Sequence, residues 1–234
     1  AARTAKYTPS ESGGPTNGGT IFSLKANGSD ARLLHTFGLE TNSAKIPNRL
    51  CDGGDGFFYG TTSQGGNSNV GTIFRIDTSG SNYSVMRHFG PAAEPRGPRG
   101  GLMKGADGWF YGTSFSGGTA NRGTIYKFNK DLGSLVVLRS LAMADGQQPQ
   151  CELVQSTAGA LFGTASIGGA QNFGTVYKIE ADGNGFSVLH SFTGGAAGQN
   201  PLSGLMIASD GGLYGTTPRL FGSFAGCIYR LNTD

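Results

Sequence analysis

The clearest hydrophobic pattern in the chain is a strict alternation over residues 72–77. Thr72, Phe74 and Ile76 fall on one side of an extended strand, whereas Ile73, Arg75 and Asp77 fall on the other. The same alternation returns over residues 124–128 and 175–179, where Lys127 and Lys178 replace Arg75. Apolar stretches also occur before Asp-Gly pairs, which are strong signals for hairpin turns. The pattern predicts short antiparallel strands joined by tight turns.

These strands belong to an internal repeat. A Tyr/Phe-Gly-Thr element begins at residues 59, 111, 162 and 214, in steps of 52, 51 and 52. A second element, Gly-Thr-Ile/Val-aromatic, begins at residues 19, 71, 123 and 174, and at 226 with Cys in place of Thr. Two independent markers therefore share a period of about 52 residues, and each period contains four predicted strands.

A four-stranded unit of this length cannot bury both of its faces alone, so the repeat predicts stacked blades of a β-propeller. A β-sandwich is the main alternative, but it gives no reason for a regular period. We expect an all-β, five-bladed propeller in a single domain, residues 1–234, with repeats at approximately 1–48, 49–100, 101–151, 152–203 and 204–234. Five full periods need 5 × 52 = 260 residues, 26 more than the 234 present, so the first and last blades are expected to be incomplete.

Composition agrees with this fold and excludes several other classes. Glycine accounts for 42 of 234 residues, which suits turns and disfavours helical bundles, and the 37% of hydrophobic residues argues against disorder. The net charge of +3 comes from scattered residues and is not a nucleic-acid footprint. No apolar run is long enough for a membrane span. Three widely separated cysteines have no metal-type spacing, and they do not make a disulfide framework.

The repeat resembles a known family. Its sequence elements are Asp-Gly, an aromatic residue, Tyr-Gly-Thr-Thr, Gly-Gly, Gly-Thr-Ile-Phe and Leu-His-Ser-Phe. They are similar to the GloVer-type tandem repeat of bacterial secreted and surface proteins and, more distantly, to NHL-type propeller repeats. The resemblance implies a propeller and an extracellular or cell-surface location, with the signal peptide outside the given chain. It supplies no catalytic residue.

Candidate binding residues lie in the loops between the second and third strands of each unit. Gly-Gly-x-x-Asn-x-Gly-Thr recurs there, and it places Asn17, Asn69, Asn121 and Asn172 at equivalent positions, with Arg122 and Phe173 next to the last two. A ring of amides could bind sugar hydroxyls or a cation. Asparagine also accepts the left-handed backbone conformation of a tight loop, and this turn role is the favoured interpretation. In the fifth copy Phe224 takes this place.

Metal and catalytic patterns are absent from the sequence. His35 and His190 are equivalent by period to Arg87 and Arg139, which indicates a framework position on a sheet face rather than a metal site. We expect no metal and no cofactor, and no catalytic residue is identified because nucleophile elbows, zinc motifs and phosphate loops are missing.

Three functional hypotheses remain. The favoured one is a non-catalytic extracellular propeller that binds a protein partner or assembles with itself through its incomplete end blades. The second is a lectin-like propeller that binds a glycan. The third is a hydrolase, lyase or lactonase that acts at the central channel, where carboxylates from different blades could meet.

Overall fold

The computed structural model of this chain describes residues 5–39, 42–91, 93–218 and 226–233. They form β-strands and one short 3-10 helix, Gly195–Ala197, and they include no helix with the length and hydrophobicity that a membrane crossing requires.

The strands form five main antiparallel sheets in chain order. The first sheet consists of β1 (Ala5–Ser10), β2 (Thr20–Lys25) and β3 (Arg32–Thr36). The second consists of β4 (Lys45–Pro47) and β5 (Cys51–Asp52), both paired with β6 (Phe57–Gln64), then β7 (Thr72–Asp77) and β8 (Tyr83–His88). The third consists of β10 (Met103–Lys104), β11 (Phe110–Ser114), β13 (Thr124–Phe128) and β14 (Leu135–Ser140).

The fourth sheet contains β15 (Val154–Gln155), β16 (Leu161–Ala165), β17 (Thr175–Ile179) and β18 (Ser187–Ser191). The fifth contains β19 (Met206–Ile207), β20 (Leu213–Thr217) and β21 (Cys227–Leu231). A small sheet of β9 (Pro95–Arg96) and β12 (Ser116–Gly117) joins two loops. Within the described residues, the first and last main sheets are therefore three-stranded, and each lacks a different strand of the repeat.

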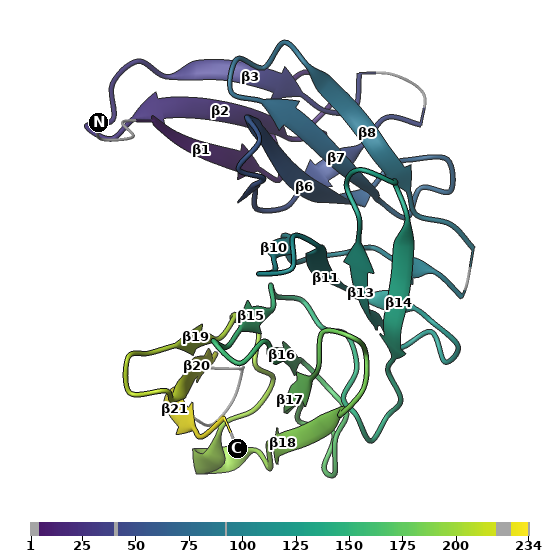
Figure 1. Cartoon of the computed structure of the whole chain (residues 1–234), viewed down its shortest axis with the longest axis vertical. Helices are drawn as coiled ribbons and strands as arrows, with labels where there is room; N and C mark the ends of the chain where they lie inside the picture. Colours follow the sequence, from purple (N-terminus) through teal and green to yellow (C-terminus); the bar gives the residue numbers. More distant parts are fainter. Residues whose placement is uncertain (1–4, 40–41, 92, 219–225, 234) are drawn as a thin grey trace.

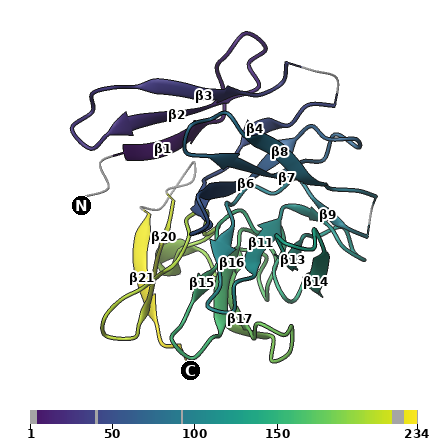
Figure 2. The same ribbon diagram turned by 45° about the horizontal axis from the view of Figure 1, so that its top comes forward.

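The five sheets follow one another along an arc that is open on one side, with the first and fifth sheets at its two ends (Figure 1). The short strands β10, β15 and β19 lie on the concave side, whereas β3, β8, β14 and β18 lie on the convex side. Figure 2 shows the same succession of sheets from a tilted direction. The predicted all-β repeat of four strands is confirmed in order, since each inner sheet runs from a short inner strand to a long outer one.

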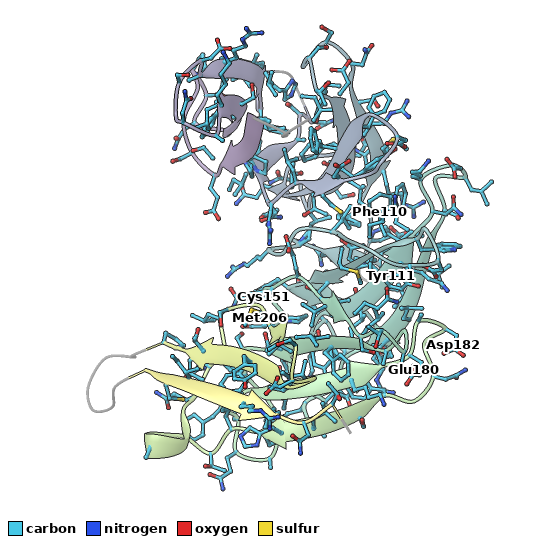
Figure 3. The ribbon with its side chains drawn as sticks, turned by 60° about the vertical axis from the view of Figure 1, so that its left-hand side comes forward. Phe110, Tyr111, Cys151, Glu180, Asp182 and Met206 are labelled. Atoms are coloured by element: carbon cyan, nitrogen blue, oxygen red, sulfur yellow. The ribbon has the colours of Figure 1, made fainter. Side chains whose placement is uncertain are left out.

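A hydrophobic core fills the space between each pair of consecutive sheets. Adjacent residues of one strand point to opposite neighbours: Phe110 packs into the core with the second sheet, and Tyr111 into the core with the fourth (Figure 3). Ile73 and Phe74 of β7 divide in the same way between two cores. Both faces of an inner sheet therefore contribute to a core, which explains why Ile73 and Phe74, neighbours that point to opposite sides, are both buried.

The glycine of the Tyr-Gly-Thr element is required by close packing across the strand pair. Gly112 lies opposite Tyr126, and a Cβ added at Gly112 would lie 2.6 Å from both Cζ and the hydroxyl oxygen of that tyrosine. The aromatic ring thus covers the glycine and reaches toward the inner strand. The other copies repeat this pair, as Gly60 with Phe74, Gly163 with Tyr177 and Gly215 with Tyr229.

Polar contacts also join consecutive sheets at equivalent positions. The threonine of the Tyr-Gly-Thr element donates a hydrogen bond to a backbone carbonyl just before the inner strand of the next sheet, with Thr61 bonded to Gly100 at 2.9 Å and Thr113 bonded to Cys151 at 3.0 Å. Thr164 donates to Ser203 in the same way at 3.3 Å. A hydroxyl that reaches across the junction fixes how far one sheet is rotated against the next.

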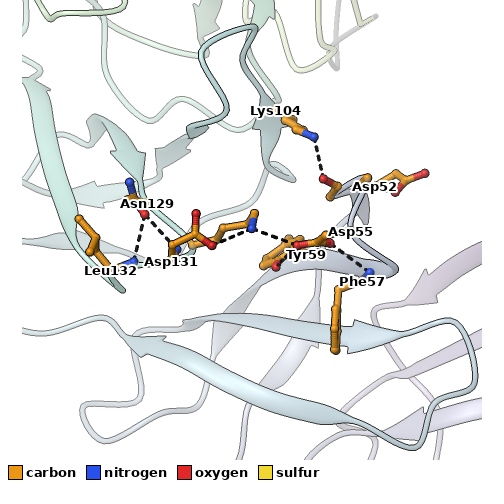
Figure 4. Close-up of polar contacts among 11 residues, drawn as sticks. Asp52, Asp55, Phe57, Tyr59, Lys104, Asn129, Asp131 and Leu132 are labelled. Carbon is orange, nitrogen blue, oxygen red and sulfur yellow. Dashed lines mark hydrogen bonds and ion pairs between the residues drawn. The ribbon is translucent and has the colours of Figure 1, made fainter.

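In the second, third and fifth sheets, the turn beside the inner strand holds a second polar contact. Tyr59 donates a hydrogen bond to Asp55 at 3.0 Å, and the ammonium group of Lys130 from the third sheet lies 3.2 Å from the same carboxylate (Figure 4). Burial alone would raise the pKa of Asp55, but the hydrogen bonds from Lys130 and Tyr59 outweigh it and lower that pKa. In the fourth repeat Ala158 and Phe162 stand in place of this acid and this tyrosine, so this polar contact has no counterpart there.

Candidate binding site

The four loop asparagines occupy equivalent turns. Each has a positive φ, between 51° and 63°, and each side-chain Oδ1 accepts a hydrogen bond from the backbone N–H of the glycine four residues earlier, at 2.9–3.0 Å. The expected turn role is confirmed for Asn17, Asn69, Asn121 and Asn172. All four asparagines are exposed. Ligand binding by their side chains stays a prediction. Phe224, the corresponding residue of the fifth copy, lies outside the described residues.

Arg122 and Phe173 take part in the junctions between sheets. The carbonyl oxygen of Arg122 accepts a hydrogen bond from the N–H of Gln148 at 2.9 Å, and that of Phe173 accepts one from Asn200 at 2.7 Å. The side chain of Arg122 bonds to Gln147, and the half-buried ring of Phe173 packs against the core between the fourth and fifth sheets. The structure therefore gives both residues a structural role, and it leaves a ligand role untested.

A polar pocket of about 580 Å³ lies where segments of all five repeats converge. The guanidinium of Arg49 forms an ion pair with Glu152 at 2.9 Å, from the second repeat to the fourth. This pair passes Gly101, where an added Cβ would lie 2.7 Å from the Arg49 carbonyl oxygen and would clash with the Glu152 carboxylate. Arg99 donates to Gln150 at 3.0 Å. The pocket can therefore accept polar and charged groups.

Burial controls the ionisation of the acidic groups in this pocket. Burial raises the pKa of Glu152, although the charge of Arg49 opposes the shift. Burial also raises the pKa of the neighbouring Cys151 thiol, to about 11, and this thiol donates a hydrogen bond to the Leu202 carbonyl at 2.9 Å. Cys151 is therefore protonated at neutral pH, which disfavours it as a nucleophile.

The framework interpretation of the histidine and arginine positions agrees with the contacts. The ring of His35 stacks on the ring of Tyr83 in the next sheet, with 3.7 Å between the ring centroids. Burial lowers the pKa of His35 to about 4, so this histidine is neutral at pH 7. Arg139 lies over the ring of Phe186 at 4.4 Å. Within the part of the chain that the structure describes, no three His, Cys, Asp or Glu side chains form a group that could hold a metal ion.

On the outer face of the fifth sheet, a residue position that is buried in the other repeats is exposed. Ile228 is 80% exposed, whereas the residues at the same place in the other repeats are completely buried: Ile21, Ile73, Ile125 and Val176. Met206 on β19 is 59% exposed. Thr216, whose equivalents donate across the junctions, is exposed and bonds to Ser203 within its own sheet at 2.8 Å.

These residues surround a shallow apolar hollow of about 350 Å³. Met206, Tyr214, Gly215, Thr216 and Ile228 line it together with Ser203 and Gly204. Figure 3 labels Met206 on β19, next to the label of Cys151 from the segment before β15. The repeat pattern had indicated an incomplete last blade, but it did not single out these side chains, because the sequence has an ordinary buried-type residue at each place.

Comparison with known proteins supports the fold. Over 92% of its length the chain is similar to 68% of a chain in a nidogen–laminin complex, with 15% identity and a TM-score of 0.61. It is similar over 97% of its length to half of TolB from Acinetobacter baumannii, with 12% identity and a TM-score of 0.60. An oligogalacturonate lyase in complex with manganese matches with 11% identity and a TM-score of 0.56, with 91% of this chain and 53% of the lyase covered.

Structural matches at such low sequence identity show only that the fold is of the β-propeller type. The chain spans only about half of the TolB and lyase chains. No curated protein matches the sequence. A family model, the Gloeobacter/Verrucomicrobia repeat, matches residues 2–229, which confirms the resemblance seen in the repeat motifs. The chain belongs to the Gloeobacter/Verrucomicrobia repeat family.

Proposed function

We propose that this chain is a non-catalytic, extracellular or cell-surface binding module that holds a protein partner, or another copy of itself, at the open end of its arc. Residues 1–234 then act as a single domain in which each of the five sheets is one propeller blade. The repeated packing supports this count, because consecutive sheets bury the same kinds of residue at each junction.

The exposed Ile228 carries the proposal. Covering one large aliphatic side chain stabilises an interface by about 1.5–3 kcal/mol, and contiguous exposed apolar residues often mark interaction surfaces. Met206 and Ile228 line one hollow beside β21, which pairs with β20 on one edge and with no strand of the described residues on the other. A protein partner can use both features at once, since an added strand satisfies the edge and its side chains cover the face.

Light scattering after size exclusion, over a range of chain concentrations, tests the proposal. We expect concentration-dependent association that Ile228→Asp abolishes, while Val136→Asp, at an exposed valine on the convex side, leaves it unchanged. A chain that stays monomeric at every concentration, with slow amide exchange throughout β21, contradicts binding at this end.

The pocket with Arg49 and Glu152 favours a second candidate, a ligand-binding or enzymatic site at the centre of the arc. A half-buried carboxyl group with a raised pKa is suited to general acid–base chemistry. Glu152→Gln tests it: loss of a hydrolase or lyase activity with the fold intact would replace the non-catalytic proposal. The glycan-binding alternative depends on the loop asparagines, and glycan binding that Asn69→Ala and Asn121→Ala do not alter removes its support.

A further inference from the structure

The polar pocket at the centre of the arc collects one equivalent repeat position from four consecutive sheets. This position directly precedes a leucine just before the inner strand, and it is occupied by Arg49, Gly101, Glu152 and Gly204. Two side chains of opposite charge therefore alternate with two glycines. Arg49 and Glu152 meet across Gly101, with 2.9 Å between the guanidinium and the carboxylate. The repeat thus places one ion pair and two positions without a side chain in a single pocket.

The two glycines differ in the space around them. A Cβ added at Gly101 would clash with the carboxylate of Glu152, whereas one at Gly204 would meet nothing closer than the Cβ of Cys151 at 3.9 Å. Arg49 donates to Oε2 of Glu152, and no group of the described residues donates a hydrogen bond to Oε1. Room therefore remains beside Glu152 on the side of the fifth sheet, next to a carboxylate that can accept a further hydrogen bond.

Arg99 adds a positive charge that forms no ion pair within the described residues. Its Nη1 donates to the neutral side chain of Gln150 at 3.0 Å, and its guanidinium carbon lies 3.7 Å from the centroid of the Phe115 ring. Contact with the aromatic face holds the planar guanidinium in one orientation. A planar carboxylate matches the remaining N–H groups of such a guanidinium, since two parallel hydrogen bonds can form.

The charges of the lining determine which kind of acid fits. Arg49 is already paired with Glu152, so Arg99 is the positive group that an acid can use. A phosphate group carries about two negative charges at neutral pH, and it would place this excess beside Glu11 and Glu152. A carboxylate carries one negative charge, and Arg99 balances it without breaking the existing ion pair.

The ion pair determines the rest of the ligand. The side chain of Arg49 is 77% exposed and donates to Glu152 through Nη1 alone within the described residues. A hydroxyl group can donate to Oε1 of Glu152 and accept from Arg49, which keeps the pair intact. An ammonium group would compete with Arg49 for the carboxylate, and an apolar group would cover both charges without a hydrogen bond. Hydroxyl groups are therefore the best match.

We infer that this pocket binds a small hydroxylated carboxylic acid of the sugar-acid type, with its carboxylate on Arg99 and its hydroxyls on Arg49 and Glu152. The three side chains come from the segments before β5, β10 and β15, and Gly204 leaves the room. The pocket volume of about 580 Å³ is within the usual range of small-molecule sites. The inference goes beyond partner binding at the end of the arc; it rests on the second candidate function and names the ligand class.

An amide NMR titration of the full chain with D-glucuronate tests the inference. D-glucose lacks the carboxylate and acetate lacks the hydroxyls, so these two compounds are the matched probes. We expect saturable shifts of the Gly100 and Gly101 amide signals with glucuronate, because both glycines line the pocket. Binding of glucose and of acetate should each be at least tenfold weaker.

Substitutions locate the bound acid. Arg99→Gln removes the charge and Gly204→Leu occupies the space beside Glu152 at a backbone position without a positive φ, so each should weaken glucuronate binding at least tenfold. Arg32→Gln, the same change at an exposed arginine of β3, should leave it unchanged. The dispersion of each amide spectrum checks the fold. Arg99→Lys keeps the charge without the planar guanidinium, and intermediate affinity is expected.

No saturable shift, equal affinity for glucose, acetate or phosphate, or unchanged affinity in Arg99→Gln overturns the inference. A Glu152-dependent activity on a compound without a carboxylate keeps the second candidate function and rejects this ligand class. Glucuronate binding does not involve Ile228. Association that depends on Ile228 without glucuronate binding therefore rejects only the acid site, and the reverse result rejects only the proposed partner binding.

Discussion

The junction between the fourth and fifth sheets and the outer face of the fifth sheet present the same repeat positions in two environments. At the junction, Val176 and Phe162 are buried under Leu205 and Leu213 of the fifth sheet. At the outer face, the equivalent residues Ile228 and Tyr214 line an open hollow. The residue types hardly change between the two regions, so exposure at the end of the arc results from a missing neighbour rather than from a polar sequence.

Whether a residue of the repeat is buried therefore depends on the neighbouring sheet and not on the sequence of the repeat itself. A single unit carries the residues for two interfaces, and each forms only when a neighbour is present. The outer face of the fifth sheet keeps apolar residues, although no neighbouring sheet among the described residues covers it. That contrast is the physical basis for proposing that a partner binds there.

The largest expected effect is the difference in stability loss between aspartate at the buried position, Val176, and aspartate at the equivalent exposed position, Ile228. Val176→Asp buries a carboxylate without a partner and should lower the free energy of unfolding by at least about 3 kcal/mol. Ile228→Asp should change it by less than about 0.5 kcal/mol at high dilution, because the side chain is exposed. Urea unfolding followed by Trp109 fluorescence measures both, and similar losses for the two variants would contradict an open face.

The next effect concerns the loop turns that meet at the junctions. Asn121→Ala removes the hydrogen bond that its Oδ1 accepts from the N–H of Gly117, and alanine tolerates the left-handed conformation less well than asparagine does, so we expect a loss of about 1–2 kcal/mol. Asn121→Gly keeps the conformation and should cost less. Thermal unfolding compares the two. Equal losses would mean that the side-chain hydrogen bond dominates and that backbone conformation contributes little.

A smaller difference is expected for the hydroxyl groups that join sheets. Thr113→Val removes the hydrogen bond to the carbonyl of the half-buried Cys151 and leaves that carbonyl with one partner fewer, which should cost about 1 kcal/mol. Thr216→Val at the open face should be close to neutral, since Thr216 is exposed and bonds only within its own sheet. Chemical unfolding of the two valine variants tests whether the hydroxyl matters only where a neighbouring sheet accepts its proton.

The smallest effect is a difference in acid sensitivity. The folded chain holds the pKa of Asp55 below its ordinary value. As the pH falls, Asp55 therefore binds a proton in the unfolded chain before it does so in the folded chain. The stability that this carboxylate contributes above about pH 4 is lost toward lower pH. Asp55→Asn should flatten that dependence between pH 5 and pH 3 and make the contact with Lys130 insensitive to pH. Unfolding curves at each pH measure the slope, and a slope that does not change shows that other carboxylates dominate it.

Much of the local structure could be predicted from particular residues. Alternation over residues 72–77 located β7, the period located its copies, and the recurring asparagines located left-handed turns. The missing strands at the two ends followed from counting the motifs. Each of these features depends on neighbours in the sequence, which is why the sequence alone was sufficient.

Contacts between distant residues could not be predicted in this way. The ion pair of Arg49 with Glu152 joins residues 103 positions apart, and no spacing rule brings them together. The roles of Arg122 and Phe173 in hydrogen bonds to the segment that leads into the next sheet were also missed, because these bonds use backbone carbonyl oxygens, which every residue type has.

The sequence by itself determined the repeat, the order of its strands and the residues that each strand turns to either side, because short-range periodicity and turn chemistry decide those features. Only the tertiary structure decided which apolar faces are covered. Ile73 and Ile228 are the same residue at the same place in the repeat, yet one is completely buried and the other is 80% exposed. Burial is a property of the packed neighbours, and the neighbour of the last sheet is not specified by the pattern within that sheet.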